Sequence, residues 1–462
     1  MKAFDLVVIG SGPGGYIAAI RAAQLGMHVA IVEEQPNLGG VCLNWGCIPT
    51  KAILSSAELF EAVKRGVPGL VVEKLAADYG AVIDASRKVA DRLARGVRSL
   101  MKKNKIEVVA GRGRLARGRE VIVTRDGADE ALEARNVILA TGSTEFVFPG
   151  LAIDGKRVLT SREALESRER PESLVVIGGG AVGLEFAYAY NAYGTKVTVV
   201  EMKDQLLPGF DAETAKALAS SLSRAGVKIL TSTAYKALEV SSKGVAVGVS
   251  GEQGDQVLSA DQVLVAVGRR ALVDDLGLDL RAVAVERGFV KIAEDYRTTA
   301  EGVYAIGDCS GPPLLAHKAS HEGVAAVEII AGQRKHGIDP RKIPACIYCQ
   351  PQVASIGLSE AEARAAGHDV KVGKAPFVAS GKAVGTGHTE GFVKLVSDAK
   401  YGEILGCQII GHGATELINE VALAMTLEST VREVGESSHA HPTLGEMVMQ
   451  AALAAEDRAL DF

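Results

Sequence analysis

The sequence predicts an α/β fold in which a strand–turn–helix–strand unit occurs twice and is followed by an α+β segment. Each unit has a short apolar strand, a G-x-G-x-x-G turn and a helix of small residues in this order, which is typical of nucleotide-binding parallel sheets. The C-terminal segment instead shows apolar strands at 392–396 and 404–410 and helical sequence from residue 414. At 462 residues the chain is long enough for about three domains.

The first unit lies at the N-terminus. Residues 4–9 form an apolar strand, a small-residue helix extends to residue 26, and a second strand, 28–32, ends at Glu33. Glu33 follows Gly10 by 23 residues, where Rossmann-like dinucleotide-binding units place the acid that accepts hydrogen bonds from a ribose. The glycines permit a tight turn and the approach of a pyrophosphate, whose charge the helix N-terminus attracts. The candidate turn residues are Gly10, Gly12, Gly14 and Gly15.

The second unit repeats this arrangement. A strand at 174–177, a helix and a strand at 196–200 lead to Glu201, again 23 residues after the first glycine of the turn. A carboxylate pairs with a free 2′-hydroxyl and repels a 2′-phosphate, and Lys203 is the only basic residue among the five that follow. The sequence therefore favours NAD over NADP. The candidate turn residues are Gly178, Gly180, Val182 and Gly183.

The ends of three further strands extend the two predicted sites. Strand 137–139 leads to an Ala-Thr-Gly turn and strand 262–265 to an Ala-Val-Gly-Arg turn, so each unit closes in the same way. Strand 303–306 runs into a Gly-Asp turn, where Asp308 is expected to accept hydrogen bonds from the polyol chain of a flavin. An ordinary helix cap is the alternative, because helical sequence resumes near residue 315. The candidate binding residues at these ends are Thr141, Gly142, Gly268, Arg269 and Asp308.

Two cysteines lie shortly after the first unit, at positions 42 and 47. Residues five apart in a regular helix are separated by about 7.5 Å along its axis, whereas a disulfide requires Cα atoms within about 7 Å. If Cys42 and Cys47 bond, the chain between them is not regular helix, and Gly46 and Pro49 indicate an irregular entry into a helix that begins near Thr50. A cysteine pair beside a dinucleotide site predicts electron transfer between thiols and a cofactor. Two buried structural thiols are the alternative.

Composition argues against a nucleic-acid-binding protein, a membrane protein and a secreted disulfide-rich protein. The formal net charge of −5 argues against nucleic-acid binding, and the basic residues at 102–105 end a mixed-charge helix expected at 80–103. No apolar run reaches the roughly 18 residues of a membrane span, so no membrane association is expected. Six cysteines in so long a chain do not form a secreted disulfide framework, which predicts a reducing, cytoplasmic location.

These motifs resemble those of the flavoprotein disulfide reductases, and the resemblance covers essentially all 462 residues in order. Its two most specific elements are Gly39-Gly40-Val41-Cys42-Leu43-Asn44-Trp45-Gly46-Cys47-Ile48-Pro49-Thr50-Lys51 and His439-Ala440-His441-Pro442-Thr443-Leu444-Gly445-Glu446. The resemblance implies two Rossmann-like domains, one for FAD (residues 1–146 and 271–342) and one for NAD (147–270). It also implies an α+β dimerisation domain at 343–462.

The resemblance also implies roles within the redox segment. Cys42 is expected to exchange with the substrate, and Cys47 is expected to lie against the flavin ring. Lys51 would sit near the reactive nitrogen of the flavin, where a cation stabilises the reduced anion, and Glu185 would pair with Lys51. Further contacts with FAD are expected at Gly40, Gly113 and Ala316.

A base is required because thiol–disulfide exchange proceeds through a thiolate. Histidine suits this task near neutral pH, and His441 is singled out by the proline that follows it and by Glu446, which would orient its imidazole. The resemblance implies that this pair acts across the dimer interface, so that each active site combines two subunits. His439 is the rival base, ranked lower because no proline follows it, and an ordinary surface histidine is the remaining alternative.

The closest branch of the family implies the reaction. It oxidises dihydrolipoamide on lipoyl domains of a 2-oxoacid dehydrogenase or glycine cleavage complex, with FAD and NAD⁺ as cofactors. A glutathione-type reductase is the first alternative, although arginines would then be expected near Glu201. A flavoprotein that serves mainly as a docking subunit is the second. The segment 346–352 departs from the family, which more often has Thr and an acid where Cys349 and Gln352 stand. We interpret Cys346 and Cys349 as structural thiols, with a regulatory disulfide as the alternative, and predict no metal site.

Overall fold

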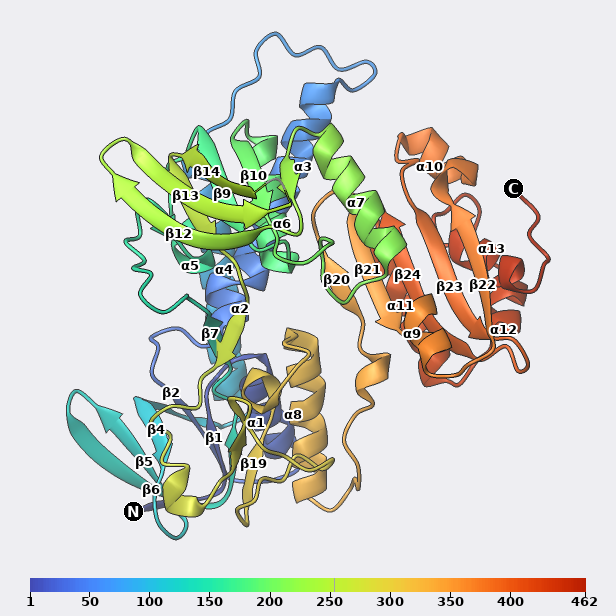
Figure 1. Cartoon of the computed structure of the whole chain (residues 1–462). Helices are drawn as coiled ribbons and strands as arrows, with labels where there is room; N and C mark the ends of the chain where they lie inside the picture. Colours follow the sequence, from blue (N-terminus) through green and yellow to red (C-terminus); the bar gives the residue numbers. More distant parts are fainter. Residues whose placement is uncertain (253) are drawn as a thin grey trace.

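The computed structural model describes residues 1–252 and 254–462 (Figure 1). Its first sheet has seven strands in the order β3-β2-β1-β6-β5-β4, with β19 paired to β6. The strands are β1 (Lys2–Ile9), β2 (Val29–Glu33), β3 (Glu107–Ala110), β4 (Arg112–Leu115), β5 (Glu120–Arg125), β6 (Ala128–Leu139) and β19 (Val303–Ala305). β1 pairs in parallel with β2 and β6. Because successive side chains of a strand point to opposite faces, Leu6 and Val8 enter one core cluster, and Val7 and Ile9 enter another.

Helices α1 (Pro13–Gln24) and α8 (Ala316–Ile330) pack side by side against this sheet. The expected strands and helix of the first unit are present within two or three residues of their predicted ends. Asp308 lies in a 3-10 turn (Gly307–Ser310), and the N-cap of α8 is Leu315. The alternative in which Asp308 caps this helix is therefore wrong.

The cysteine segment forms two helices, α2 (Gly40–Trp45) and α3 (Cys47–Arg65), separated by Gly46. The expectation that the chain between the cysteines is not regular helix is confirmed. The predicted start of the second helix near Thr50 is wrong by three residues, because Pro49 is accommodated in the first turn, where its missing N–H is not needed. A Cβ on Gly46 would approach the carbonyl oxygen of Val41 to 3.1 Å, so the sharp turn favours glycine.

The second sheet has five parallel strands in the order β11-β10-β9-β15-β8. They are β8 (Val158–Leu159), β9 (Ser173–Ile177), β10 (Lys196–Val200), β11 (Lys228–Leu230) and β15 (Gln262–Val265). Its helices are α5 (Ser161–Ala164), α6 (Ala181–Ala192) and α7 (Ala212–Arg224). An antiparallel sheet of β12 (Ala234–Ser241), β13 (Gly244–Gly251) and β14 (Gly254–Ala260) adjoins it, and smaller pairs form between β7 (Ser143–Glu145) and β16 (Arg269–Ala271) and between β17 (Val285–Glu286) and β18 (Phe289–Val290).

The C-terminal part is an antiparallel sheet in the order β20-β21-β24-β23-β22. Its strands are β20 (Ala345–Ile347), β21 (Gln352–Gly357), β22 (Val370–Pro376), β23 (Phe392–Asp398) and β24 (Ile404–Gly411). Its helices are α9 (Glu360–Ala365), α10 (Gly381–Thr386), α11 (Ala414–Thr426), α12 (Val431–Glu436) and α13 (Glu446–Ala455). Both strands and the helix expected in this segment are present.

The three parts share one cluster of buried apolar side chains, and a buried ion pair joins two of them. Ile53 of α3, Leu184 of α6 and Ile347 of β20 belong to the same cluster of buried side chains. Separately, the side chain of Lys394, 7% exposed, lies 3.1 Å from Asp211 at the start of α7. A buried ion pair of this kind joins the second sheet to the C-terminal sheet.

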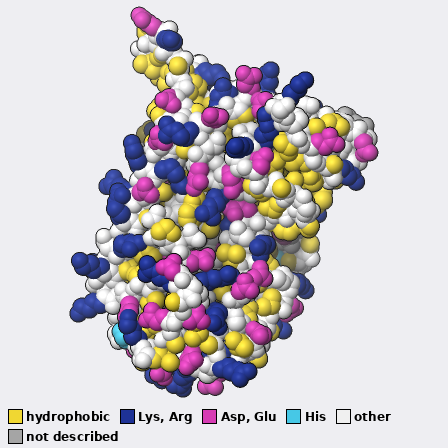
Figure 2. Space-filling model, turned by 90° about the vertical axis from the view of Figure 1, so that its left-hand side faces the viewer, with side chains coloured by type: hydrophobic (Ala, Val, Ile, Leu, Met, Phe, Trp, Pro, Cys, Tyr) yellow, Lys and Arg dark blue, Asp and Glu magenta, His cyan; other side chains and the backbone are white. Residues whose placement is uncertain are grey.

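The connection from α3 to α4 (Tyr79–Lys103) projects from the body of the molecule (Figures 1 and 2). It carries exposed apolar side chains, among them Val71 at 89%. On the face in Figure 2, acidic and basic side chains are interspersed. In the part of the chain that the structure describes, every helix is too short or too polar to cross a membrane.

Candidate active site

A cavity of about 690 Å³ runs from the first glycine turn past the cysteine pair to the start of α6. It therefore touches both dinucleotide-binding units. The expected site residues that line it are Gly10, Gly12, Gly14, Glu33, Gly40, Cys42, Cys47, Lys51, Gly113, Thr141, Gly142, Val182, Glu185, Arg269, Asp308 and Ala316. Those outside its lining are Gly15, Gly178, Gly180, Gly183, Glu201, Gly268, His441 and Glu446.

The two glycine turns have the same geometry. Gly10 has φ +101°, and a Cβ there would lie 2.3 Å from the carbonyl oxygen of Ala140; Gly178 has φ +110°, and its Cβ would lie 2.3 Å from that of Ala266. Only glycine accommodates both the left-handed backbone and the close approach. The matching geometry at Gly10 and Gly178 supports a duplicated unit, in which the same glycine pattern forms the same turn.

The two acids at the strand ends are held in the same way. The Glu33 carboxylate accepts the backbone N–H of Ser11 at 3.0 Å and that of Gln35 at 2.8 Å. The Glu201 carboxylate accepts those of Gly179 at 2.7 Å and Lys203 at 2.8 Å. Each acid is thus fixed against its own glycine turn, with lone pairs still available to a ligand.

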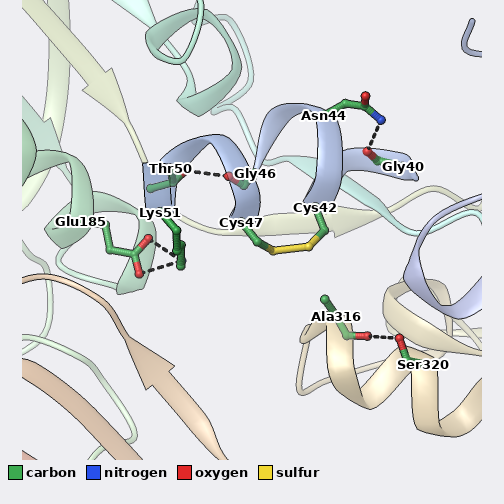
Figure 3. The surroundings of a disulfide bond; sticks show 10 residues. All are labelled: Gly40, Cys42, Asn44, Gly46, Cys47, Thr50, Lys51, Glu185, Ala316 and Ser320. Carbon is green, nitrogen blue, oxygen red and sulfur yellow. Dashed lines mark hydrogen bonds and ion pairs between the residues drawn. A yellow bond between two sulfur atoms is a disulfide. The ribbon is translucent and has the colours of Figure 1, made fainter. Parts of the chain in front are cut away.

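Cys42 and Cys47 form a disulfide, with their Cα atoms 4.7 Å apart (Figure 3). Ala316, at the start of α8, lies across from it in this view. Lys51, one helical turn beyond Cys47, donates to both carboxylate oxygens of Glu185, at 2.9 and 3.0 Å. The redox segment is therefore linked directly to α6 through the predicted pair of Lys51 and Glu185.

A third part of the chain completes this link. The backbone N–H of Tyr348 donates to Glu185 at 3.0 Å, and Lys51 Nζ lies 4.2 Å from the centre of the Tyr348 ring. Tyr348 is not predicted from the sequence, because no local pattern relates it to Lys51. Its only signal was its position in the segment that departs from the family.

Asp308 is supported by a residue that the sequence analysis also missed. Ser143 donates its hydroxyl to the Asp308 carboxylate and accepts a hydrogen bond of 2.7 Å from Arg269 Nε. Ser143 directly follows the Ala-Thr-Gly turn, and this adjacency was a usable signal. The pair β7–β16, which carries Ser143 and Arg269, thus connects the ends of the two units.

His441 and Glu446 form a hydrogen-bonded pair away from this cavity. Nδ1 of His441 lies 2.9 Å from Glu446, whose other oxygen accepts the Thr443 N–H at 2.8 Å. These two hydrogen bonds, that from Thr443 first, lower the pKa of Glu446. The His441 side chain is 78% exposed, and its Nε2 has no hydrogen-bond partner among residues 1–252 and 254–462.

His439 has the opposite environment. Its side chain is 10% exposed, and its ring nitrogens lie 2.7 Å from Glu420 and 2.9 Å from the carbonyl oxygen of Ser437. Both nitrogens are therefore engaged. Of the two histidines, only His441 presents a ring nitrogen to an incoming group.

Cys346 and Cys349 are both free thiols, so the described structure contains no disulfide between them. Burial raises the pKa of Cys346 to about 11, and burial also raises that of Cys349. Cys346 lines the cavity. Within the described residues, no group of three or more His, Cys, Asp or Glu side chains is arranged to hold a metal ion.

The family described as pyridine nucleotide-disulphide oxidoreductase matches residues 4–323, and its dimerisation domain matches residues 343–452. Dihydrolipoyl dehydrogenase of Zymomonas mobilis is 44% identical over 99% of each chain. That of Chlorobaculum tepidum is 48% identical over 97% of this chain and 96% of its own.

Solved structures agree with these relatives. LpdA from Mycobacterium tuberculosis superimposes with a TM-score of 0.91 at 27% identity and covers 98% of this chain and 99% of its own. The HOCl-induced flavoprotein disulfide reductase RclA from Escherichia coli gives 0.85 at 25% identity, over 98% and 99%. The duplicated glycine turns, the disulfide and these matches agree: the chain belongs to the pyridine nucleotide-disulphide oxidoreductase family.

Proposed function

We propose that this protein oxidises dihydrolipoyl groups to lipoyl groups and passes the electrons through FAD to NAD⁺. The observation that carries the proposal is the Cys42–Cys47 disulfide in the same cavity as the first glycine turn and the Lys51–Glu185 pair. The curated relatives named dihydrolipoyl dehydrogenase support the substrate and the enzyme class.

The cavity residues fit FAD. Gly12 is the N-cap of α1 and makes no side-chain cap in the described chain, and a Cβ on it would meet no atom within 4 Å. The free N–H groups of the helix therefore face open space that suits a pyrophosphate. We assign the FAD-binding domain to residues 1–146 and 271–342. Its expected contacts that line the cavity are Gly10, Gly12, Gly14, Glu33, Gly40, Lys51, Gly113, Thr141, Gly142, Asp308 and Ala316. Gly15 supports the turn by packing, because its Cβ would lie 2.0 Å from the Gly10 carbonyl oxygen.

The second unit fits a pyridine nucleotide in the same way. Gly180 is the N-cap of α6, and a Cβ on it would also meet no atom within 4 Å. Glu201 would accept hydrogen bonds from the ribose and disfavour a 2′-phosphate, so we propose NAD rather than NADP. The NAD-binding domain would comprise residues 147–270, with Val182, Gly183, Gly268 and Arg269 near the cofactor.

The thiol chemistry follows from the residues present. His441 removes a proton from one substrate thiol, and the thiolate attacks Cys42 Sγ, which breaks the disulfide and releases the Cys47 thiolate. The second substrate thiol then gives up its proton and, as a thiolate, attacks the first substrate sulfur in this mixed disulfide, which closes the lipoyl disulfide and releases the Cys42 thiolate to take up that proton. Lys51 supplies positive charge beside Cys47. Bound FAD would carry the resulting electron pair to NAD⁺ as a hydride.

The position of His441 supports a shared active site. Its imidazole is exposed and does not line the cavity of its own chain, and the family's dimerisation domain covers residues 343–452. We propose a homodimer in which the His441–Glu446 pair of one subunit serves the disulfide of the other. The interface domain would comprise residues 343–462.

We propose that the physiological substrate is carried by lipoyl domains of a 2-oxoacid dehydrogenase or glycine cleavage complex. A cytoplasmic location is consistent with four free cysteines in the described chain.

The test is to purify the protein and to measure NADH formation from dihydrolipoamide and NAD⁺. Two parallel assays would replace NAD⁺ by NADP⁺, and would supply glutathione disulfide together with NADPH. Rapid NADH formation by a yellow protein is expected. A yellow protein that ignores dihydrolipoamide but reduces glutathione disulfide would retain the fold and overturn the substrate.

A further inference from the structure

Trp45 lies between the two redox cysteines, at the C-terminal end of α2, and is the only tryptophan of the chain. Its indole N–H donates to the Glu166 carboxylate at 2.9 Å. The guanidinium of Arg162 lies 4.2 Å from the centre of its ring. Both partners belong to the segment of α5, in the second unit, whereas Trp45 belongs to the first.

A second contact holds the redox segment six residues after Trp45. Lys51 pairs with Glu185 of α6, which is also in the second unit. Cys47 therefore lies between two attachment points, Trp45 and Lys51. Both attachments join the short stretch that contains the break in the helix at Gly46 to the second unit.

Arg87 of α4, in the first unit, holds the same segment through its backbone. It donates to the carbonyl oxygen of Asn44, the residue before Trp45. Burial lowers the pKa of Arg87, and the Glu166 carboxylate acts against this effect. Glu166 thus interacts both with Trp45, within the redox segment, and with Arg87, which holds the preceding residue.

We propose that Trp45 is a positioning residue that sets the thiol–disulfide equilibrium of Cys42 and Cys47. After reduction, the two thiols re-form a disulfide more readily the closer the turn holds them, because their effective concentration is then higher. Glu166 and Arg162 hold the turn through the indole, and this favours the oxidised pair. The inference rests on the proposed function, because it requires this pair to be the redox couple.

The test is the equilibrium between the holoenzyme and a dithiothreitol buffer of varied ratio, without NAD⁺. Each dithiothreitol molecule loses two hydrogens to form its cyclic disulfide, and Cys42 and Cys47 gain them as two thiols. Acid quenching, alkylation and peptide mass then give the fraction reduced. In Glu166→Ala and Trp45→Val, the equilibrium constant for reduction of the Cys42–Cys47 disulfide is expected to rise about tenfold, which corresponds to a shift of about 30 mV in its reduction potential. Trp45→Phe, which keeps the ring under Arg162, is expected to fall between these variants and the wild type.

The matched control is Arg168→Ala. Arg168 also connects the region after α5 to α4, through Asp84, but touches neither cysteine nor Trp45. The inference would be overturned if the equilibrium constants of Glu166→Ala and Trp45→Val stayed within twofold of wild type, or if Arg168→Ala shifted the constant equally. A wild-type pair that dithiothreitol does not reduce at all would instead overturn the proposed function.

Discussion

Lys51 Nζ lies 2.9 Å from Glu185 Oε2, and this ion pair joins the redox helix to the second dinucleotide-binding unit. The Glu185 side chain is 6% exposed and that of Lys51 is 32% exposed. Because Glu185 also accepts the Tyr348 N–H, one carboxylate connects the first unit, the second unit and the C-terminal sheet. The cation beside the disulfide is therefore held by all three parts of the chain.

Replacing Lys51 by methionine should slow turnover from dihydrolipoamide to NAD⁺ by roughly 100-fold, since a preorganised charge at a reacting centre contributes about that much. The protein should still bind FAD. Stopped-flow rates and the flavin spectrum provide the measurement. Lys371→Met, at an exposed lysine that pairs with Asp457, is the control, and similar losses in both variants would contradict a local role for Lys51.

Replacing His441 by glutamine should lower dihydrolipoamide oxidation by roughly 100-fold or more, the usual contribution of a general base. Electron transfer from NADH to a dye should persist, because it needs no thiol deprotonation. Both activities would be measured on the same preparation, with the exposed His368 replaced by glutamine as the control. Equal loss of the two activities would indicate that His441 has a structural role.

The Glu446 carboxylate should stay charged at pH values at which glutamate is usually protonated. Hydrogen bonds from Thr443 and His441 lower its pKa in the folded state. A lowered folded pKa stabilises the protein at pH values above the unfolded pKa, and this stabilisation is lost as the pH falls through the folded pKa. Unfolding free energies of wild type and Glu446→Gln should therefore differ at pH 7 and converge only under acidic conditions. A difference that stays constant down to pH 3 would contradict this assignment.

Replacing Glu201 by alanine should reduce kcat/KM for NAD⁺ by roughly tenfold or more, since hydrogen bonds to a charged group contribute about 1.5–3 kcal/mol. The ratio of NADP⁺ to NAD⁺ activity should rise, because the repulsion of a 2′-phosphate is removed. Steady-state kinetics with both nucleotides test this, with the exposed Glu239→Ala as the control. An unchanged ratio would argue that Glu201 only supports its glycine turn.

Replacing Lys394 by methionine should destabilise the protein by about 3–5 kcal/mol, because it leaves Asp211 buried without its counter-charge. The neighbouring Lys374 also pairs with an acid of α7 but is 41% exposed. Lys374→Met should therefore cost less than about 1 kcal/mol. Denaturant unfolding of both variants gives the comparison, and equal losses would show that burial does not decide the effect.

The local sequence was sufficient to predict the two dinucleotide-binding units. A glycine with positive φ, the helix that follows it and an acid at the end of the next strand are set by residues within 23 positions of one another. The structure accordingly repeats the same geometry at Gly10 and Gly178. The helix boundaries around Cys47 were less predictable, because Pro49 is compatible both with a helix start and with a first turn.

Sequence patterns were thus enough to predict the duplicated fold, the redox segment and, through resemblance, the partners of the ion pair at Lys51. The packing of the folded chain was needed to show that Glu166 holds Trp45, that Tyr348 donates to Glu185, and that Lys394 is buried against Asp211. The partners in these contacts lie 121, 163 and 183 residues apart, respectively. Periodicity and turn chemistry act over short stretches, whereas these contacts depend on how separate sheets pack together.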